Sequence, residues 1–330
     1  MDPTICALPR LGIDISKTTF DACLLLADGK TFSEVFANTE SGFQELDAWL
    51  AKRHAKITLA GLEATGPYSQ ALLWHLNLQD HHVCLLNPRR VKDYARSQGR
   101  KVKTDATDAK VIASYLRTNE HLQLWQPPSE ALVALQALVR RRQQVMDMLQ
   151  AERNRQENKR LPAAVADSTK HLIIVLKAEA ANLVRLMDKL VLQNAALQKS
   201  MRLLCSIPGV GRLVAVTILA EVPAISAFTR ARDLAAFAGL TPALAESGTS
   251  VRRRGHMTKE GSALLRKMLY MAALQAVKRK TNAFNPCYQA FIERGKAKMC
   301  AIGAIMHKII RVAFGVLKHD TPFAENLARL

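Results

Sequence analysis

Four carboxylates in the first third of the chain have the residue type and placement to hold divalent metal ions. They are Asp14, Glu63, Asp105 and Asp108. Hard cations such as Mg²⁺ take oxygen ligands and are usually held by a few carboxylates together with phosphate oxygens of the substrate. Two such ions, roughly 3.5–4 Å apart, stabilise both the attacking and the leaving oxygen of an in-line phosphoryl displacement. The pattern predicts a metal-dependent nuclease site, although a single Asp at a helix start is usually only a cap.

The first two acids are expected at strand ends. Residues 11–16 form an apolar, β-rich run that contains Asp14, and the apolar run 57–63 ends in Glu63 just before a Gly-containing turn. The other two acids open a helical stretch, in which a three-residue step puts Asp105 and Asp108 on the same face. The two acids of this second pair can therefore point one way.

The order of elements around these acids predicts a mixed sheet with helices on its faces. Asp28-Gly29 is a strong hairpin signal between two apolar runs. Periodicity predicts strands at 10–16, 19–27, 30–37, 57–63 and 82–86, and helices at 41–54, 68–79, 88–98 and 105–119.

Residues 130–206 read as helix apart from a break near Leu161-Pro162. A leucine recurs every seven residues at Leu176, Leu183, Leu190, Leu197 and Leu204. The stripe is equally compatible with a helical hairpin or oligomer contact and with ordinary packing inside the monomer. It shows only that this side of the helix is buried.

Two later segments carry weaker signals. Residues 207–211, Ile-Pro-Gly-Val-Gly, separate this helix from another at 213–222, which is the pattern of a helix-hairpin-helix whose backbone N–H groups face a phosphate, or of a plain helical corner. Ser247 stands in a Gly-containing loop before the triplet Arg252-Arg253-Arg254, and a further helix is expected at 261–280. Most loop serines are turn residues, so Ser247 alone indicates little.

Composition favours a nucleic-acid partner. The 330 residues carry a formal charge of +19 with a pI near 10, and residues 1–60 hold six Lys or Arg against eight Asp or Glu, so the excess lies later in the chain. Six scattered cysteines without a C-x-x-C pair indicate neither a disulfide framework nor a zinc site. We find no signal peptide and no apolar run that approaches the roughly 18 residues of a membrane-spanning helix, so we expect a cytoplasmic protein without membrane contact.

Taken together, the motifs resemble those of an insertion-sequence transposase family, the bridge-RNA-guided recombinases. The matching segments follow the family's order over nearly the whole chain. They are Gly12-Ile13-Asp14, Glu63-Ala64-Thr65-Gly66, Asn87-Pro88, Lys103-Thr104-Asp105, Asp108-Ala109, residues 207–211, Phe237-Ala238-Gly239-Leu240-Thr241-Pro242 and Glu246-Ser247-Gly248.

This resemblance implies an RNase H-like, RuvC-like α/β domain at 1–125, a helical coiled-coil-like segment at 126–200, and a mostly α transposase domain at 201–330. It implies that Ser247 attacks a DNA phosphodiester to leave a phosphoserine link, that the four acids hold Mg²⁺, with Mn²⁺ as a substitute and two metal ions expected, and that exchange passes through a Holliday junction. The implied partners are donor DNA, target DNA, an element-encoded non-coding bridge RNA, and further copies of the chain in a tetramer.

The predicted nucleic-acid contacts are basic or glycine residues in these segments. They are Arg89, Arg90, Arg100, Lys101, Lys103, Gly209, Gly211, Arg252, Arg253, Arg254, Lys259 and Arg266.

Three other functions use the same residues differently. A hydrolytic junction resolvase would use the four acids with water and would not need Ser247. An actin-like kinase or ATPase is suggested by Gly12-Ile13-Asp14-Ile15-Ser16-Lys17-Thr18, but no second Gly-rich phosphate loop follows and the charge of +19 suits it poorly. A non-catalytic nucleic-acid-binding protein would keep every activity when Asp14 is replaced by alanine.

Overall fold

The computed structural model describes most of the chain as two compact units, Met1–Pro127 and Pro128–Leu330. The described residues are 5, 7–63, 66–98, 105–119, 122, 124–158, 160–222, 224–243, 246–247, 251–252, 256–259, 261–279 and 282–324. For residues 66–67, 105–107, 243, 246–247, 251–252 and 256, the description covers the backbone alone.

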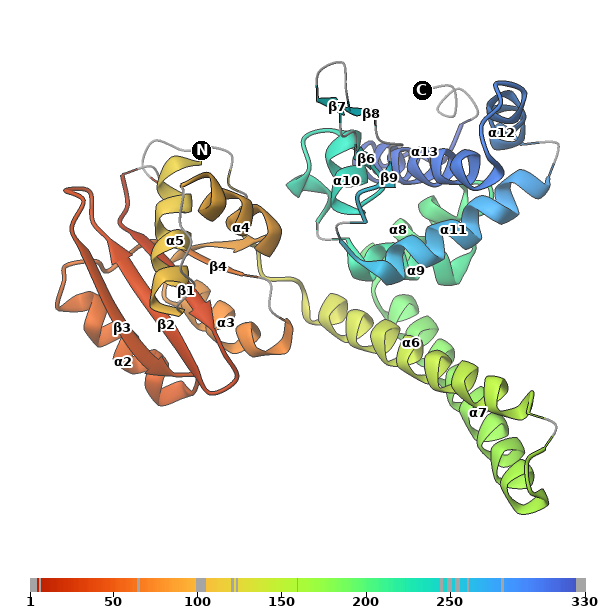
Figure 1. The fold of residues 1–330 in the computed structure, drawn as a ribbon, viewed down its shortest axis with the longest axis horizontal. Helices are drawn as coiled ribbons and strands as arrows, with labels where there is room; N and C mark the ends of the chain where they lie inside the picture. The colour runs from red at the N-terminus through yellow and green to blue at the C-terminus, as the bar shows by residue number, and fades with distance from the viewer. Residues whose placement is uncertain are drawn as a thin grey trace. The chain divides into compact units, whose positions relative to one another are not determined.

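The first unit is built on a five-stranded mixed sheet (Figure 1). Its strands stand in the order β3-β2-β1-β4-β5, with β1 antiparallel to β2 and parallel to β4. Their bounds are β1 Arg10–Ile15, β2 Thr19–Leu25, β3 Thr31–Ala37, β4 Leu59–Glu63 and β5 His82–Leu86. The helices are α2 Glu40–Ala51, α3 Gln70–Leu78, α4 Pro88–Ser97 and α5 Asp105–Thr118, with a short 3₁₀ turn η1 at Gly66–Ser69.

Alternate side chains along each strand feed two separate cores, because successive residues point to opposite faces. On one face, Leu11 and Ile13 of β1 pack with Leu46 of α2 and Leu76 of α3. On the other face, buried strand residues pack against α4 and α5; this set is Leu59, Cys84, Leu86, Val91, Val111, Ile112 and Leu116. Helices therefore cover both faces of the sheet, which confirms the predicted mixed α/β arrangement.

Each predicted element of this unit forms, with ends shifted by a few residues. The turn between β2 and β3 follows the Asp28-Gly29 signal: Gly29 has a φ of 89°, and its N–H donates to the Leu26 carbonyl over 3.0 Å. The Asp28 carboxylate accepts from the Lys30 N–H over 3.0 Å, which lowers the pKa of Asp28.

The second unit is helical apart from short strand pairs. Its helices are α6 Glu130–Gln156, α7 Ala163–Gln193, α8 Ala195–Cys205, α9 Arg212–Glu221, α10 Ala231–Phe237, α11 Ala263–Lys278, α12 Phe284–Glu293 and α13 Lys298–Lys318, with the 3₁₀ turn η2 at Ile225–Ala227. A break at Asn194, which the sequence pattern does not predict, ends α7 and starts α8. Asn194 caps α8 by accepting from the Leu197 N–H over 3.0 Å.

The seven-residue leucine stripe packs inside the chain. Leu183 and Leu204 are buried in the main core of the second unit, and Leu176, Leu190 and Leu197 pack against it. Helices α6 and α7 pack against each other as the expected helical hairpin, and packing within the chain accounts for these leucines, while the oligomer contact stays a prediction.

Helix α13 is long and apolar enough to cross a membrane, which the sequence pattern does not predict. Buried residues such as Ile305, Ile309 and Ala313 place it in the main core of the second unit, and 56% of the apolar window is buried. The helix is thus accounted for as a core helix, and the cytoplasmic location stays a prediction.

Candidate functional site: a carboxylate face and a serine hairpin

Two of the four predicted acids leave neighbouring parallel strands on one face of the sheet. In the β1–β4 register Gly12 stands beside Gly61 and Ile13 beside Leu62, so the next residues, Asp14 and Glu63, follow side by side. Side chains alternate along a strand, so both acids share the face on which the two glycines lie. Both carboxylates are half-buried.

The two glycines let helix α5 approach this face closely. A Cβ added at Gly12 would overlap the Ala109 carbonyl oxygen and the Ala113 nitrogen of α5. One added at Gly61 would lie 2.9 Å from the Leu116 methyl carbons. Asp108 directly precedes Ala109, so the third acid stands on the helix that covers the carboxylate face.

The described carboxylates do not by themselves complete a metal site. Within the described part of the chain, no group of three or more His, Cys, Asp or Glu side chains is placed to hold a metal ion. The backbone of Asp105 begins α5, and its side chain lies outside the described residues. The donor type on this face, carboxylate oxygen, is the one that Mg²⁺ prefers.

A further acid on this face was missed by the sequence analysis. Asp21 of β2 pairs directly with Asp14, so the two side chains are cross-strand neighbours on one face. The structure fixes this pairing through the turn: the Ser16 N–H donates to the Thr19 carbonyl over 2.8 Å, and counting outward from that pair places residue 21 opposite residue 14.

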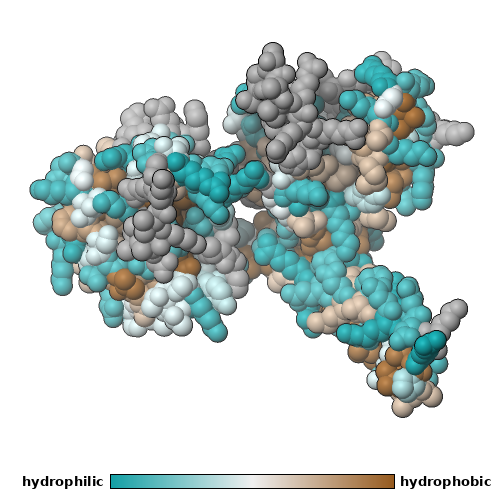
Figure 2. Space-filling model, viewed as in Figure 1, coloured by the Kyte–Doolittle hydropathy of each residue, from teal (hydrophilic) through white to brown (hydrophobic). Residues whose placement is uncertain are grey.

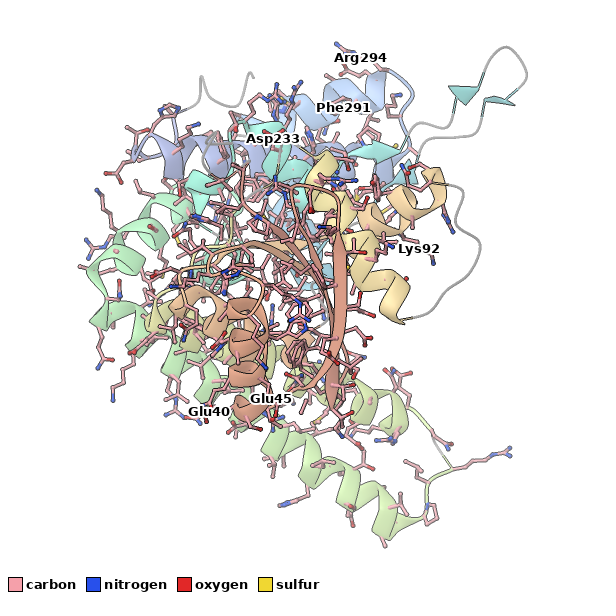
Figure 3. All side chains as sticks on the ribbon, turned by 90° about the vertical axis from the view of Figure 1, so that its left-hand side faces the viewer. Glu40, Glu45, Lys92, Asp233, Phe291 and Arg294 are labelled. Atoms are coloured by element: carbon pink, nitrogen blue, oxygen red, sulfur yellow. The ribbon has the colours of Figure 1, made fainter. Side chains whose placement is uncertain are left out.

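Ser247 lies in a narrow antiparallel hairpin of the second unit. Strand β6 (Pro242–Ala243) pairs with β9 (His256–Met257), and inside this pair β7 (Glu246–Ser247) pairs with β8 (Val251–Arg252). The β7–β8 pair lies outside the helices of its unit in both ribbon views (Figures 1 and 3). The predicted nucleophile is thus carried beyond the helical core, with its side chain outside the described set.

The hairpin leaves and rejoins the core through a stem that we define as residues 239–242 and 256–259. The Thr258 N–H donates to the Thr241 carbonyl over 3.0 Å, and the Lys259 N–H donates to the Gly239 carbonyl over 3.1 Å. Gly239 and Lys259 both have positive φ values, 68° and 55°. The backbone turns sharply at the base of the hairpin on both sides.

The two helices expected around residues 207–211 form as α8, a turn and α9, which fits both the helix-hairpin-helix and the plain helical corner. Gly209 has a φ of 87°, and a Cβ there would lie 2.8 Å from the Ala276 Cβ of α11 and overlap the Ala272 carbonyl. The glycine at position 209 is therefore explained by the close approach of α11. Gly211 is exposed and caps the N-terminus of α9, whose first turn carries no acidic residue, so N–H groups are presented there.

The predicted basic contacts differ in exposure. Arg89 and Arg90 lie on the exposed side of α4, next to Lys92, which Figure 3 labels, and Lys259 is exposed at the stem. Arg266 instead points its guanidinium at two backbone carbonyls. Arg100, Lys101, Lys103, Arg253 and Arg254 lie outside the described residues, and Arg252 is described by its backbone alone.

Burial makes three of the described cysteines poor nucleophiles. Cys23, Cys84, Cys205, Cys287 and Cys300 are free thiols, and Cys6 lies outside the described part. Burial raises the pKa of the Cys84 thiol to about 12 and also raises the pKa values of Cys23 and Cys205. A thiol held protonated is a poor nucleophile.

Comparison with known proteins covers both units. Residues 11–159 match a transposase family of the DEDD type, and residues 201–289 match the family described as "Transposase IS116/IS110/IS902 family". Two proteins called "Pilin gene-inverting protein", from Moraxella bovis and Moraxella lacunata, are each 32% identical over 96% of this chain and 98% of their own length. The "Transposase for insertion sequence element IS1111A" of Coxiella burnetii is 26% identical over 95% of this chain and 90% of its own.

Proposed function

Because this chain belongs to the IS116/IS110/IS902 family of transposases and is therefore a DNA recombinase, we propose that it exchanges DNA strands through a covalent link to Ser247. In this proposal Asp14, Glu63, Asp105 and Asp108 hold Mg²⁺ on an RNase H-like domain. The observation that carries it is the placement of Asp14 and Glu63 side by side on one sheet face, in a chain that also carries Ser247 on a projecting hairpin.

The proposed step is a transesterification at phosphorus. The Ser247 hydroxyl loses its proton, its oxygen forms a bond to phosphorus, and the bond from phosphorus to the leaving DNA oxygen breaks, with that oxygen taking up a proton in exchange. One ester bond replaces another, so no co-reactant is needed, and attack by the hydroxyl of a second strand releases the serine. A serine hydroxyl is a weak nucleophile without activation, and bound Mg²⁺ would supply that activation as a Lewis acid.

The proposal also assigns target choice to a non-coding RNA that pairs with donor and target DNA. The exposed arginines and lysine of α4 and the presented N–H groups at Gly211 support a role in binding phosphates. Because RNA and DNA present the same phosphate chemistry, both partners fit these groups.

Association of several copies through the α6–α7 hairpin is part of the same proposal. Large apolar side chains are exposed along these two helices, with Ile174 66% exposed, and Figure 2 shows hydrophobic patches on the hairpin. The exposed set is Val133, Met148, Val165, Leu172, Ile174, Val175, Leu186 and Leu192. Sedimentation of the full chain should give a tetramer, and Ile174→Glu should shift it toward smaller species; a monomer in both cases would contradict the contact.

The experiment that tests the chemistry is a denaturing gel of the protein with Mg²⁺, the element's flanking non-coding RNA, and labelled donor and target DNA. Wild-type protein should give a protein–DNA adduct, and Ser247→Ala should give none while still assembling. Ser250→Ala serves as the neighbouring control and should keep the adduct. Cleaved ends without an adduct would instead indicate the hydrolytic nuclease.

The metal-holding role is tested in the same assay with Asp14→Asn, which removes charge with little change of shape. The adduct should disappear while RNA binding is kept. Asp28→Asn is the matched control, because Asp28 lies at an exposed turn of the same unit and an Asn oxygen can still accept from the Lys30 N–H. If Asp14→Asn still forms the adduct, Asp14 is not one of the metal-holding acids.

A further inference from the structure

The stem of the serine hairpin is held by one arginine. Arg266 lies in the first turns of α11 and donates from Nη1 to two backbone carbonyls, Gly261 over 2.9 Å and Ala238 over 3.3 Å. Ala238 directly precedes the outgoing strand of the stem, and Gly261 follows the returning strand. The guanidinium therefore bridges the two points at which the hairpin joins the core.

The same two points are in direct backbone contact. Gly261 has a φ of 110°, and a Cβ added there would overlap the Phe237 carbonyl oxygen. The next residue, Ser262, caps α11 by accepting from the Leu265 N–H over 3.1 Å, so the return of the chain is fixed to the start of that helix. Met257 of β9 packs against the main core of the second unit, so the described contacts that can direct the hairpin lie at its stem.

The environment of Arg266 differs from that of the adjacent lysine. Arg266 is half-buried, and desolvation lowers the pKa of its guanidinium, as happens when a charge faces protein and not water. Lys267 is 57% exposed in its side chain and lies 3.7 Å from Asp147 of α6. A side chain that contacts a nucleic-acid phosphate is expected to resemble Lys267 in exposure more than Arg266.

We propose that Arg266 is a positioning residue that sets the direction of the serine hairpin, in place of the phosphate contact expected from its charge. The inference rests on the proposed role of Ser247. A small tilt at the base of a hairpin is amplified at its far strands, and a misplacement of about 1 Å at the reacting atom can cost roughly 100-fold in rate. The loss should appear in the chemical step and not in binding.

The test compares Arg266→Met with Lys267→Met, its neighbour on the same helix. At saturating DNA and RNA, Arg266→Met should form the adduct about 10- to 100-fold more slowly, with nucleic-acid affinity and its salt dependence unchanged. Lys267→Met should keep the wild-type rate. Gly261→Ala should reproduce the slow adduct formation although it removes no charge, and Arg266→Lys should recover part of the rate.

Amide hydrogen exchange supplies a readout independent of chemistry. In Arg266→Met the Thr258 and Lys259 amides should lose protection, while α11 amides and the far-UV transition stay as in wild type. The proposal is overturned if Arg266→Met forms the adduct at the wild-type rate at saturation but binds nucleic acid more weakly. A slope of log affinity against log salt concentration reduced by about one would then identify a phosphate contact. Unchanged protection at both amides would also overturn it. If Ser247→Ala keeps its adduct, the proposed nucleophile fails, and the exchange data still decide whether Arg266 holds the stem.

Discussion

The two regions that carry the proposed chemistry are built in opposite ways. The carboxylate face stands on strands that are covered by helices on both sides, and α5 approaches the sheet as closely as Gly12 and Gly61 allow. The serine hairpin consists of two-residue strands joined to the helical core by a stem of a few hydrogen bonds. Acids that share metal ions need fixed mutual spacing, which a core supplies, whereas a nucleophile that must reach a DNA strand is better carried beyond the core.

This difference changes what a substitution does. A change beneath the carboxylate face should weaken the folding of the whole first unit, because the packing there is continuous with two cores. A change at the stem should alter the position of the serine with little effect on global stability. Trp49, Trp74 and Trp125 are the chain's three tryptophans and all lie in the first unit, so their fluorescence reports on that unit alone.

The largest effect is expected from Gly12→Ala. The new methyl group would overlap backbone atoms of Ala109 and Ala113, which cannot move without displacing α5. Overpacking against a rigid neighbour costs about 3 kcal/mol or more at the upper end of its range. Denaturant unfolding followed by tryptophan fluorescence should show the midpoint falling sharply.

The same Gly12→Ala protein also tests whether the two units are energetically separate. Far-UV ellipticity, which is dominated by the helices of the second unit, should keep its main transition. If both signals fell together, the contrast between the two regions would be wrong and the molecule would unfold as one cooperative body. An unchanged tryptophan midpoint would instead mean that α5 does not pack tightly on Gly12.

A smaller effect is expected from pH, again in the first unit. His81 is 4% exposed, and its Nδ1 accepts from the Thr58 N–H over 3.1 Å, so this nitrogen must be unprotonated. Burial lowers the pKa of His81 from its ordinary value of 6.5. The unfolded chain therefore takes up this proton at a higher pH than the folded chain. The stabilisation is fully present above pH 6.5 and is lost as the pH falls below it.

The tryptophan-monitored free energy of unfolding should drop between pH 7 and pH 5, by at most about 1.4 kcal/mol per pH unit from this group. His81→Asn, whose amide oxygen can take the place of Nδ1, should reduce that dependence. His54→Asn is the control, since Asn tolerates the positive φ of 56° at this position and the Thr58 contact is untouched. If the free energy of unfolding depends on pH equally in wild type and His81→Asn, this histidine is not the source of that dependence.

The sequence predicts the sheet unit well because its information is local. Alternating apolar residues and a Gly-containing turn define the strands, and a parallel pair follows from their order. The break at Asn194 is not predictable in this way, since good helix formers flank it on both sides and only the capping bond reveals it. The pairing of Asp21 with Asp14 depends on the placement of a tight turn, which sequence periodicity does not fix.

The candidate site is predicted less completely, because charge alone does not distinguish roles. Arg266 was expected to contact phosphate, but its guanidinium donates to the Gly261 carbonyl and to the Ala238 carbonyl, and Ala238 is 28 positions away in the sequence. The residue types of Asp14 and Glu63 suggest a metal site, but their shared face follows from a strand register. The side chains of Asp105 and Ser247 lie outside the described set, and their roles stay predictions.

The smallest effect should come from Gly315→Ala, in the second unit. Gly315 lies inside α13, and a Cβ added there meets no atom within 4 Å. Alanine restricts the unfolded chain and favours the helix, so stability should rise by about 0.5–1 kcal/mol. The far-UV midpoint should rise slightly while the tryptophan midpoint stays constant. The contrast with Gly12→Ala is direct, because the same substitution destabilises where a helix rests on the glycine and stabilises where the space is open. A destabilised Gly315→Ala protein would mean that another surface covers this side of α13.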